Sequence, residues 1–203
     1  MVTTDWQRVP GDLAPQGWAD HVLGDIAEGQ GALFEKRLLD LFIAGLGLIV
    51  FAPVMLLAAM AIKVSSRGPV LHHSRRLGRN GRIFHCLKFR TMTADEAVTS
   101  IGAWLRRYGL DELPQLVNVL RGDMSVVGPR PVMASAHVGP QIYRMRRFEM
   151  TPGMTGLWAA AQHDFAAAGA FVSPDETYRN HWSLWLDLRI IVRSLGTALA
   201  GRG

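Results

Sequence analysis

The chain has 203 residues, of which 49% are hydrophobic and 19% charged, and its formal net charge is +5 at pH 7. This length suits one domain with a real core and a small appendage. The single cysteine excludes an internal disulfide bond and a cysteine-based metal cluster. The excess of basic residues favours an anionic partner, which is a phospholipid surface, a phosphorylated substrate or nucleic acid.

The first segment of the chain is acidic. Its carboxylates stand among glycines and prolines and are Asp5, Asp12, Asp20, Asp25 and Glu28. We predict an acidic N-terminal extension over residues 1–31, followed by one folded domain over residues 32–203.

A stretch from Leu41 to Ile62 contains no charged residue and is long enough to cross a bilayer, which takes about 20 helical residues. Pro53 stands within it, removes a backbone N–H and disfavours a straight helix. Basic residues, which tend to remain cytoplasmic, flank both ends. We therefore predict a membrane-embedded re-entrant helix hairpin over about residues 36–64, bent at Pro53. A proline-kinked helix that crosses the membrane is the alternative.

A basic block follows, from Ser65 to Arg107. Within it, residues 83–89 have the composition of a strand with two different faces. Lys88 and Arg90 occupy alternate positions there, so their side chains are expected on one face. The residues alone leave three interpretations open: an exposed basic strand, a phospholipid contact or a site for a substrate phosphate.

The densest group of reactive side chains surrounds Asp111 and Glu112. Apolar residues recur downstream at helical spacing, and Pro114 is acceptable only in a first turn, so a helix is expected to begin near Asp111. In one interpretation Asp111 caps this helix and Glu112 is a favourable first-turn acid. In the other, the pair handles a phosphorylated substrate and Mg²⁺, because carboxylates bind this ion and an aspartate can attack phosphorus.

Arg130 lies between Pro129 and Pro131, whose fixed φ angles limit the freedom of the backbone around it. This arrangement indicates either a pre-positioned cation for a phosphate or a solvated turn residue.

The last segment, from about Glu176 to Leu199, combines apolar and basic residues. Trp182 and Trp185 are expected in an interfacial stripe, with a packed core helix as the alternative. Helical patterns dominate from Ile101 onward. The fold class is therefore expected to be α+β and mainly helical, with a re-entrant hairpin, a compact cytoplasmic domain and interfacial amphipathic helices.

Several motifs stand in one order along the chain. They are KRLLDLFIAGLGLIVFAPV, KFRTM, RRYGLDELPQLVNVLRGDMSVVGPRPV, PGMTGLW and HWSLWLDLRII. Together they closely resemble bacterial sugar transferases, the monotopic polyprenyl-phosphate phosphoglycosyl transferases, over about residues 32–198. Five motifs in register make this resemblance specific.

The resemblance implies an enzyme that transfers a sugar 1-phosphate from a UDP-sugar to a polyprenyl phosphate such as undecaprenyl phosphate, releasing UMP. This is the first membrane step of exopolysaccharide or glycoconjugate synthesis, at the cytoplasmic face of the bacterial inner membrane. A non-catalytic membrane scaffold of a polysaccharide assembly complex is the alternative. The expected partners are the two substrates and the phospholipid bilayer; nucleic acid is not expected, because few aromatic residues interleave the basic block.

The resemblance also assigns roles to residues. Asp111 is implied as the nucleophile that carries the phosphosugar and as a ligand of the required Mg²⁺, with Glu112 as its general base or a second orienting acid. The expected substrate-binding residues are Lys88, Arg90, Arg106, Pro129, Arg130, Pro131 and His163.

One departure from the family pattern concerns His163, which stands where an arginine is usual. A histidine is a weaker, pH-dependent donor, so the sugar specificity is in doubt while the reaction type is not. The identity of the sugar, the preferred lipid length, the role of the extension and the formation of a homodimer stay open.

Overall fold

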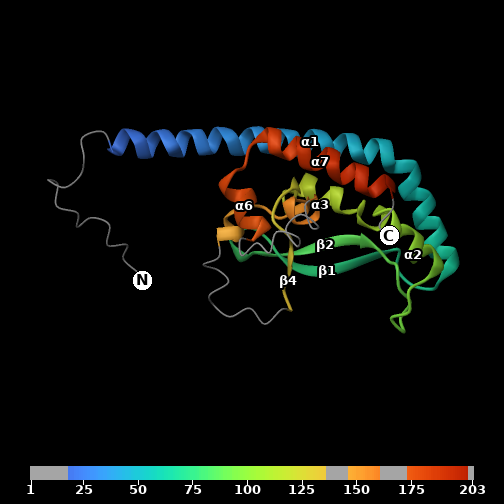
Figure 1. The fold of residues 1–203 in the computed structure, drawn as a ribbon. Helices are drawn as coiled ribbons and strands as arrows, with labels where there is room; N and C mark the ends of the chain where they lie inside the picture. Colours follow the sequence, from blue (N-terminus) through green and yellow to red (C-terminus); the bar gives the residue numbers. More distant parts are fainter. Residues whose placement is uncertain (1–17, 136–145, 161–172, 201–203) are drawn as a thin grey trace. The chain divides into compact units, whose positions relative to one another are not determined.

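This computed structural model describes residues 18–135, 146–160 and 173–200 (Figure 1). The chain divides into two units, Met1–Leu38 and Leu39–Gly203. The first unit contains the beginning of helix α1, Trp18–Ser65, and the second contains the rest of it and all other described elements. The acidic extension stays a prediction, since residues 1–17 lie outside the described part.

After α1, short strands and helices alternate. The strands are β1 Leu71–Leu77, β2 Ile83–Phe89, β3 Ser125–Val127, β4 Val132–Met133 and β5 Gly153–Thr155. The α-helices are α2 Ser100–Arg107, α3 Gln115–Arg121, α4 Leu157–Ala160, α6 Pro174–Asn180 and α7 Leu184–Ala200. The 3₁₀ turns are η1 Arg79–Gly81, η2 Leu110–Glu112 and η4 Arg146–Glu149. The described fold is mixed and mostly helical, which confirms the predicted α+β class.

The predicted strand over residues 83–89 is confirmed as β2, which pairs with β1 in an antiparallel hairpin. Strand β4 joins the other edge of β1, and β3 and β5 form a separate parallel pair. Successive side chains of a strand point to opposite faces. Phe84 and Cys86 are therefore buried on one face of β2, while His85 between them is exposed. In Figure 1 this hairpin lies on one side of α3, and α7 lies on the other.

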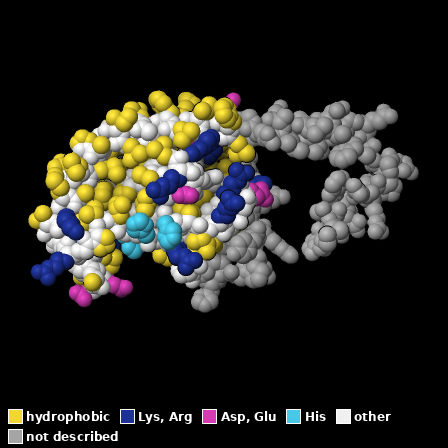
Figure 2. Space-filling model, turned by 180° about the vertical axis from the view of Figure 1, so that it is seen from behind, with side chains coloured by type: hydrophobic (Ala, Val, Ile, Leu, Met, Phe, Trp, Pro, Cys, Tyr) yellow, Lys and Arg dark blue, Asp and Glu magenta, His cyan; other side chains and the backbone are white. Residues whose placement is uncertain are grey.

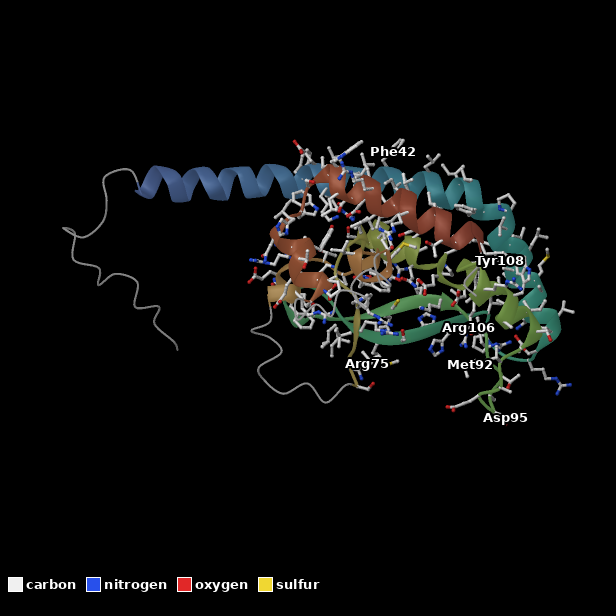
Figure 3. The ribbon with its side chains drawn as sticks, in the orientation of Figure 1. Phe42, Arg75, Met92, Asp95, Arg106 and Tyr108 are labelled. Carbon is white, nitrogen blue, oxygen red and sulfur yellow. The ribbon has the colours of Figure 1, made fainter. Side chains whose placement is uncertain are left out.

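Helix α1 carries the apolar stretch and bends in its later, teal part (Figure 1). Pro53 lies within it and explains a bend, because its ring removes a backbone donor and clashes with the preceding turn. Among the described residues, Leu33–Ser65 is the one helix long and apolar enough to cross a membrane, and only 11% of its most apolar window is buried. Phe42 points outward from the helix (Figure 3) and is 68% exposed. A bend of this kind is compatible with both membrane interpretations.

Asp40 connects α1 to β3. Its carboxylate accepts hydrogen bonds from the Ser125 hydroxyl and from the Val126 N–H, both at 2.9 Å, and Asp40 and Ser125 are buried. Charged acceptors make stronger hydrogen bonds than neutral ones. The aspartate that follows the basic flank of the apolar stretch therefore holds α1 to β3.

Asn118 connects α3 to β2 and is completely buried. Its side-chain oxygen accepts from the Leu87 N–H at 3.0 Å, and its amide nitrogen donates to the His85 carbonyl at 2.8 Å. These two contacts determine the position of α3 along β2, the strand that carries Lys88. Because η2 directly precedes α3, they also determine where the Asp–Glu pair lies.

The helix expected to begin near Asp111 begins later. A 3₁₀ turn, η2, holds Asp111 and Glu112 and opens at Gly109 with a left-handed φ of 68°. The α-helical bonding starts only after Pro114, at Gln115. The predicted start was wrong because the proline lies before the α-helix rather than inside its first turn.

The two tryptophans of the last segment have different environments. Trp182 packs against the core and donates its Nε1–H to the Asp187 carboxylate at 3.2 Å. Trp185 is 63% exposed, and Leu188, Val192 and Leu195 are exposed with it on α7. Trp182 thus belongs to the core, while Trp185 lies on an apolar surface.

Candidate active site

One cavity of about 740 Å³ opens beside the β1–β2 hairpin. Strands β1 and β2 contribute Arg76, Cys86 and Lys88, and the η2–α3 segment contributes Glu112 and Gln115. The remaining walls come from the turn at residues 130–131, from residues 153–160 and from α7. Figure 2 shows lysine and arginine side chains gathered on one face around an acidic group, with histidines nearby.

Lys88 and Glu112 form the ion pair of this cavity. The Lys88 Nζ lies 2.8 Å from Glu112 Oε1, and the two side chains are 27% and 23% exposed. Lys88 faces the cavity because it follows Cys86 by two residues on the same face of β2. A carboxylate held by a cation in a half-buried wall is fixed in orientation, which suits it for accepting a proton or for orienting a ligand.

Asp111 lies directly beside this pair but is more enclosed. It is 7% exposed, and among the described residues the cavity is lined by Glu112 and not by Asp111. The structure thus places Lys88 beside the two adjacent carboxylates, with Glu112 at the cavity wall and Asp111 more enclosed.

Arg130 also reaches the cavity. Its guanidinium lies over the Trp158 ring, 5.1 Å from the ring centroid, and its backbone N–H donates to Asp175 at 3.2 Å. Pro131 lines the cavity, whereas the Pro129 carbonyl accepts from the Gly153 N–H at 2.9 Å. The prediction of a cation held in a rigid turn agrees with these contacts.

The contacts of Arg90 are structural: they join the end of β2 to the turn after α1. Its guanidinium donates to the carbonyls of Ser66 and Arg67, at 2.9 and 3.0 Å. Gly68 there has a φ of 126°, and a Cβ on it would lie 2.0 Å from the Arg90 Nη1. Arg90 therefore fastens the turn after α1 to the end of β2, and it is not among the described residues that line the cavity.

Arg106 and His163 complete the predicted set. Arg106 donates through Nε to the Thr91 hydroxyl at 2.8 Å, and Figure 3 shows it beside the segment that carries Met92. It too is absent from the described lining of the cavity. His163 lies outside the described residues.

Several residues that line the cavity were not among those expected from the sequence. Arg76 lines the wall and donates to the Pro131 carbonyl at 3.2 Å, so it connects β1 to the turn that carries Arg130. Arg193 lines the cavity from α7. The Thr155 and Ser194 hydroxyls there lie 2.7 Å apart. One signal was available in the sequence: Arg76 follows Ser74 by two residues on β1, so their side chains share one face of the strand. To use it, one must know which face of β1 points toward the cavity.

Cys86 lines the cavity and is the chain's single cysteine. Burial raises the pKa of its thiol, an effect that the Lys88 charge opposes. The thiol is therefore neutral at physiological pH, and a thiolate nucleophile is not available at this position.

The donor set for a metal is sparse. Among the described residues, no three or more histidine, cysteine, aspartate or glutamate side chains lie close enough together to hold a metal ion. Mg²⁺ needs no such group, because it commonly binds through one or two carboxylates and completes its shell with water and substrate phosphates. The adjacent carboxylates Asp111 and Glu112 fit that pattern.

These features describe a chain with one long apolar helix and a basic, carboxylate-containing cavity, and the comparisons give its class. The model of the bacterial sugar transferase family matches residues 31–201, so the chain belongs to this family and the predicted resemblance is confirmed.

Three relatives illustrate the similarity. An undecaprenyl-phosphate glucose phosphotransferase of Komagataeibacter xylinus is 38% identical over 199 residues, covering 84% of this chain and 37% of its own length. A UDP-glucose:undecaprenyl-phosphate glucose-1-phosphate transferase of Caulobacter vibrioides is 41% identical, covering 81% and 69%. The exopolysaccharide production protein ExoY of Rhizobium meliloti is 35% identical, covering 83% and 87%. The chain thus spans between about a third and most of its relatives' lengths.

Proposed function

We propose that this chain is a phosphoglycosyl transferase that moves a sugar 1-phosphate from a UDP-sugar to undecaprenyl phosphate. The products are UMP and undecaprenyl-diphosphate sugar, and the reaction begins the synthesis of an exopolysaccharide or glycoconjugate. The observation that carries the proposal is the Lys88–Glu112 pair beside Asp111, in a cavity that also holds the Arg130 and Arg76 side chains. Relatives named for this reaction support it.

The reaction proceeds in two displacements at phosphorus. A carboxylate oxygen of Asp111 bonds to the β-phosphorus, and the bond from that phosphorus to the bridging oxygen breaks, so that UMP leaves with its electron pair. A phosphate oxygen of the lipid then attacks the same phosphorus and releases the carboxylate. Such transfers depend mainly on alignment and on neutralisation of the phosphoryl oxygens.

The cations of the cavity provide that neutralisation. Arg130 is suited to a diphosphate, because a guanidinium offers two parallel donors. Lys88 orients Glu112 through their ion pair. Glu112 directly follows Asp111 in the chain, so the two carboxylates share one environment. Asp111 and Glu112 would hold Mg²⁺, which would supply further compact positive charge at the diphosphate.

We further propose that α1 enters the membrane from the cytoplasmic side and returns to it. Basic residues at both ends of the apolar stretch and the bend of α1 support this topology. The exposed apolar side chains of α7, including Trp185, would then lie at the interface. This arrangement holds the cavity at headgroup depth on the inner membrane, where the lipid phosphate is found.

The test is a panel of UDP-sugars assayed with undecaprenyl phosphate and Mg²⁺, with UMP release as the readout. At least one sugar should support turnover, and Asp111→Asn should abolish turnover and the covalent adduct. Peptide mass spectrometry of a reaction trapped before lipid addition should find the phosphosugar on residue 111. Glu112→Gln is the matched variant, expected to form the adduct slowly.

Two outcomes would contradict the proposal. An adduct on Glu112, the carboxylate at the cavity wall, would overturn the assignment of the nucleophile. Silence across a broad panel, with correctly folded protein, would favour the membrane scaffold instead.

A further inference from the structure

The backbone of Arg130 is held on both sides by one ion pair. Its N–H donates to Asp175 Oδ1 at 3.2 Å, and its carbonyl accepts from Arg147 Nη2 at 2.8 Å. The same Arg147 nitrogen lies 2.6 Å from Asp175 Oδ2. The three residues therefore form a closed set of contacts, which we call the Arg130 clamp. Arg147 comes from η4 and Asp175 from α6, far from Arg130 in sequence.

The clamp is enclosed. Asp175 is 5% exposed, and the Arg147 side chain is 25% exposed. Burial raises the pKa of Asp175, while the Arg147 charge and the Arg130 N–H oppose this rise. A buried pair of this kind adds little net stability, because desolvation offsets much of the attraction. Its distinctive contribution is geometric, because the two paired side chains hold the Arg130 N–H and carbonyl in place. Removing one partner would leave the other charge uncompensated.

The other end of Arg130 is also positioned. The guanidinium lies over the Trp158 ring, and Trp158 donates its Nε1–H to the Gly128 carbonyl at 3.2 Å. The clamp and this ring together hold both the backbone and the charged group of Arg130. A cation held in advance loses less conformational entropy when it binds an anion.

We propose that Asp175 and Arg147 are positioning residues that hold Arg130 ready for the diphosphate of the donor. The identity of that ligand rests on the proposed function. The two residues themselves do not contact the donor and act only through Arg130.

The first test compares two isosteric variants of the intact chain in detergent. Asp175→Asn keeps an acceptor for the Arg130 N–H but removes the charge that holds Arg147. It should raise the Kd for UDP, measured by calorimetry, and the KM for the active UDP-sugar by about tenfold, with a smaller change in kcat. The control is Glu149→Gln, because Glu149 pairs with Arg179 between the same two elements without contacting Arg130. It should change neither constant.

A double-mutant cycle separates positioning from a general loss of structure. In an Arg130→Ala background, Asp175→Asn should have no further effect on the UDP Kd, since no guanidinium remains to be positioned. Arg147→Lys should fall between wild type and Asp175→Asn, because a lysine retains a charge for Asp175 but lacks the rigid planar guanidinium that directs Nη2 at both the carboxylate and the Arg130 carbonyl. Because the Arg147 side chain is partly exposed, Arg147→Lys is the variant whose UDP Kd decides the question if Asp175→Asn does not fold.

The outcomes are distinct. Equal UDP affinities for Asp175→Asn and Glu149→Gln would overturn the clamp, as would full additivity with Arg130→Ala. A wild-type protein that binds UDP without turning over any UDP-sugar would contradict the proposed function alone, and the clamp would still be decided by the UDP affinities.

Discussion

At the scale of single residues, the Lys88–Glu112 ion pair fixes the position of one cation and one carboxylate in the cavity wall. The pair is half-buried, so its two charges are less screened than those of surface ions. Removing Lys88 leaves Glu112 without its cation and the cavity with one positive charge fewer.

We therefore expect Lys88→Met to lower kcat/KM for the UDP-sugar by about 10- to 100-fold, in the range of lost electrostatic stabilisation at active sites. Steady-state UMP release measures this effect. Lys63→Met is the matched control, because Lys63 donates to the Gly68 carbonyl and does not line the cavity. Equal activities of the two variants would contradict the role of Lys88.

Asp187 shows how one buried residue acquires a structural role. The Tyr178 hydroxyl lies 2.6 Å from Asp187 Oδ1, and Trp182 donates to the other oxygen. Burial raises the pKa of Tyr178, so its hydroxyl keeps the proton that it donates. Through its contact with Tyr178, Asp187 connects α7 to α6.

At the scale of elements, the position of α3 against β2 depends on Asn118. Strand β2 lies at the edge of its sheet, and the Asn118 side chain bonds there to the Leu87 N–H and the His85 carbonyl. They hold Lys88 and Glu112 on facing elements.

Asn118→Ala should lower the free energy of unfolding by about 2–4 kcal/mol, because a buried donor and a buried acceptor both lose their partner. Chemical unfolding in detergent measures the change. Asn180→Ala, an exposed asparagine at the end of α6, should cost well under 1 kcal/mol. A cost for Asn118→Ala no greater than this control would show that the α3–β2 contact is not a determinant of the fold.

At the scale of the whole molecule, the topology of α1 decides whether the two ends of the apolar stretch share one side of the membrane. Single cysteines at Glu35→Cys and Arg67→Cys, in a Cys86→Ala background, report each end separately. Both should resist a membrane-impermeant maleimide in intact cells and react in inverted vesicles.

Labelling of either end from outside would instead establish a kinked, membrane-crossing helix. Pro53→Leu provides a comparison, because a straight apolar helix of this length favours crossing. In that variant Glu35→Cys should become accessible from outside while Arg67→Cys stays protected.

The amino-acid sequence alone determined the local features of this protein. The uncharged stretch with Pro53, the strand that carries Lys88 and the adjacent carboxylates of Asp111 and Glu112 follow from composition and spacing over a few residues. Such features depend on side-chain period and backbone geometry within one element. The family motifs in their order were likewise available without coordinates, and the family is confirmed.

Only the tertiary structure decided which cations face the cavity. Lys88, Arg130 and Arg76 line it, whereas Arg90 holds a turn and Arg106 bonds to Thr91. All five are basic residues, and the sequence alone does not sort them into these two groups. Which of them face the cavity depends on strand register and on contacts between distant segments. The same holds for the Arg130 clamp, since its partners come from two helical turns far along the chain. Local patterns specify elements, while the packing of elements against one another specifies the site.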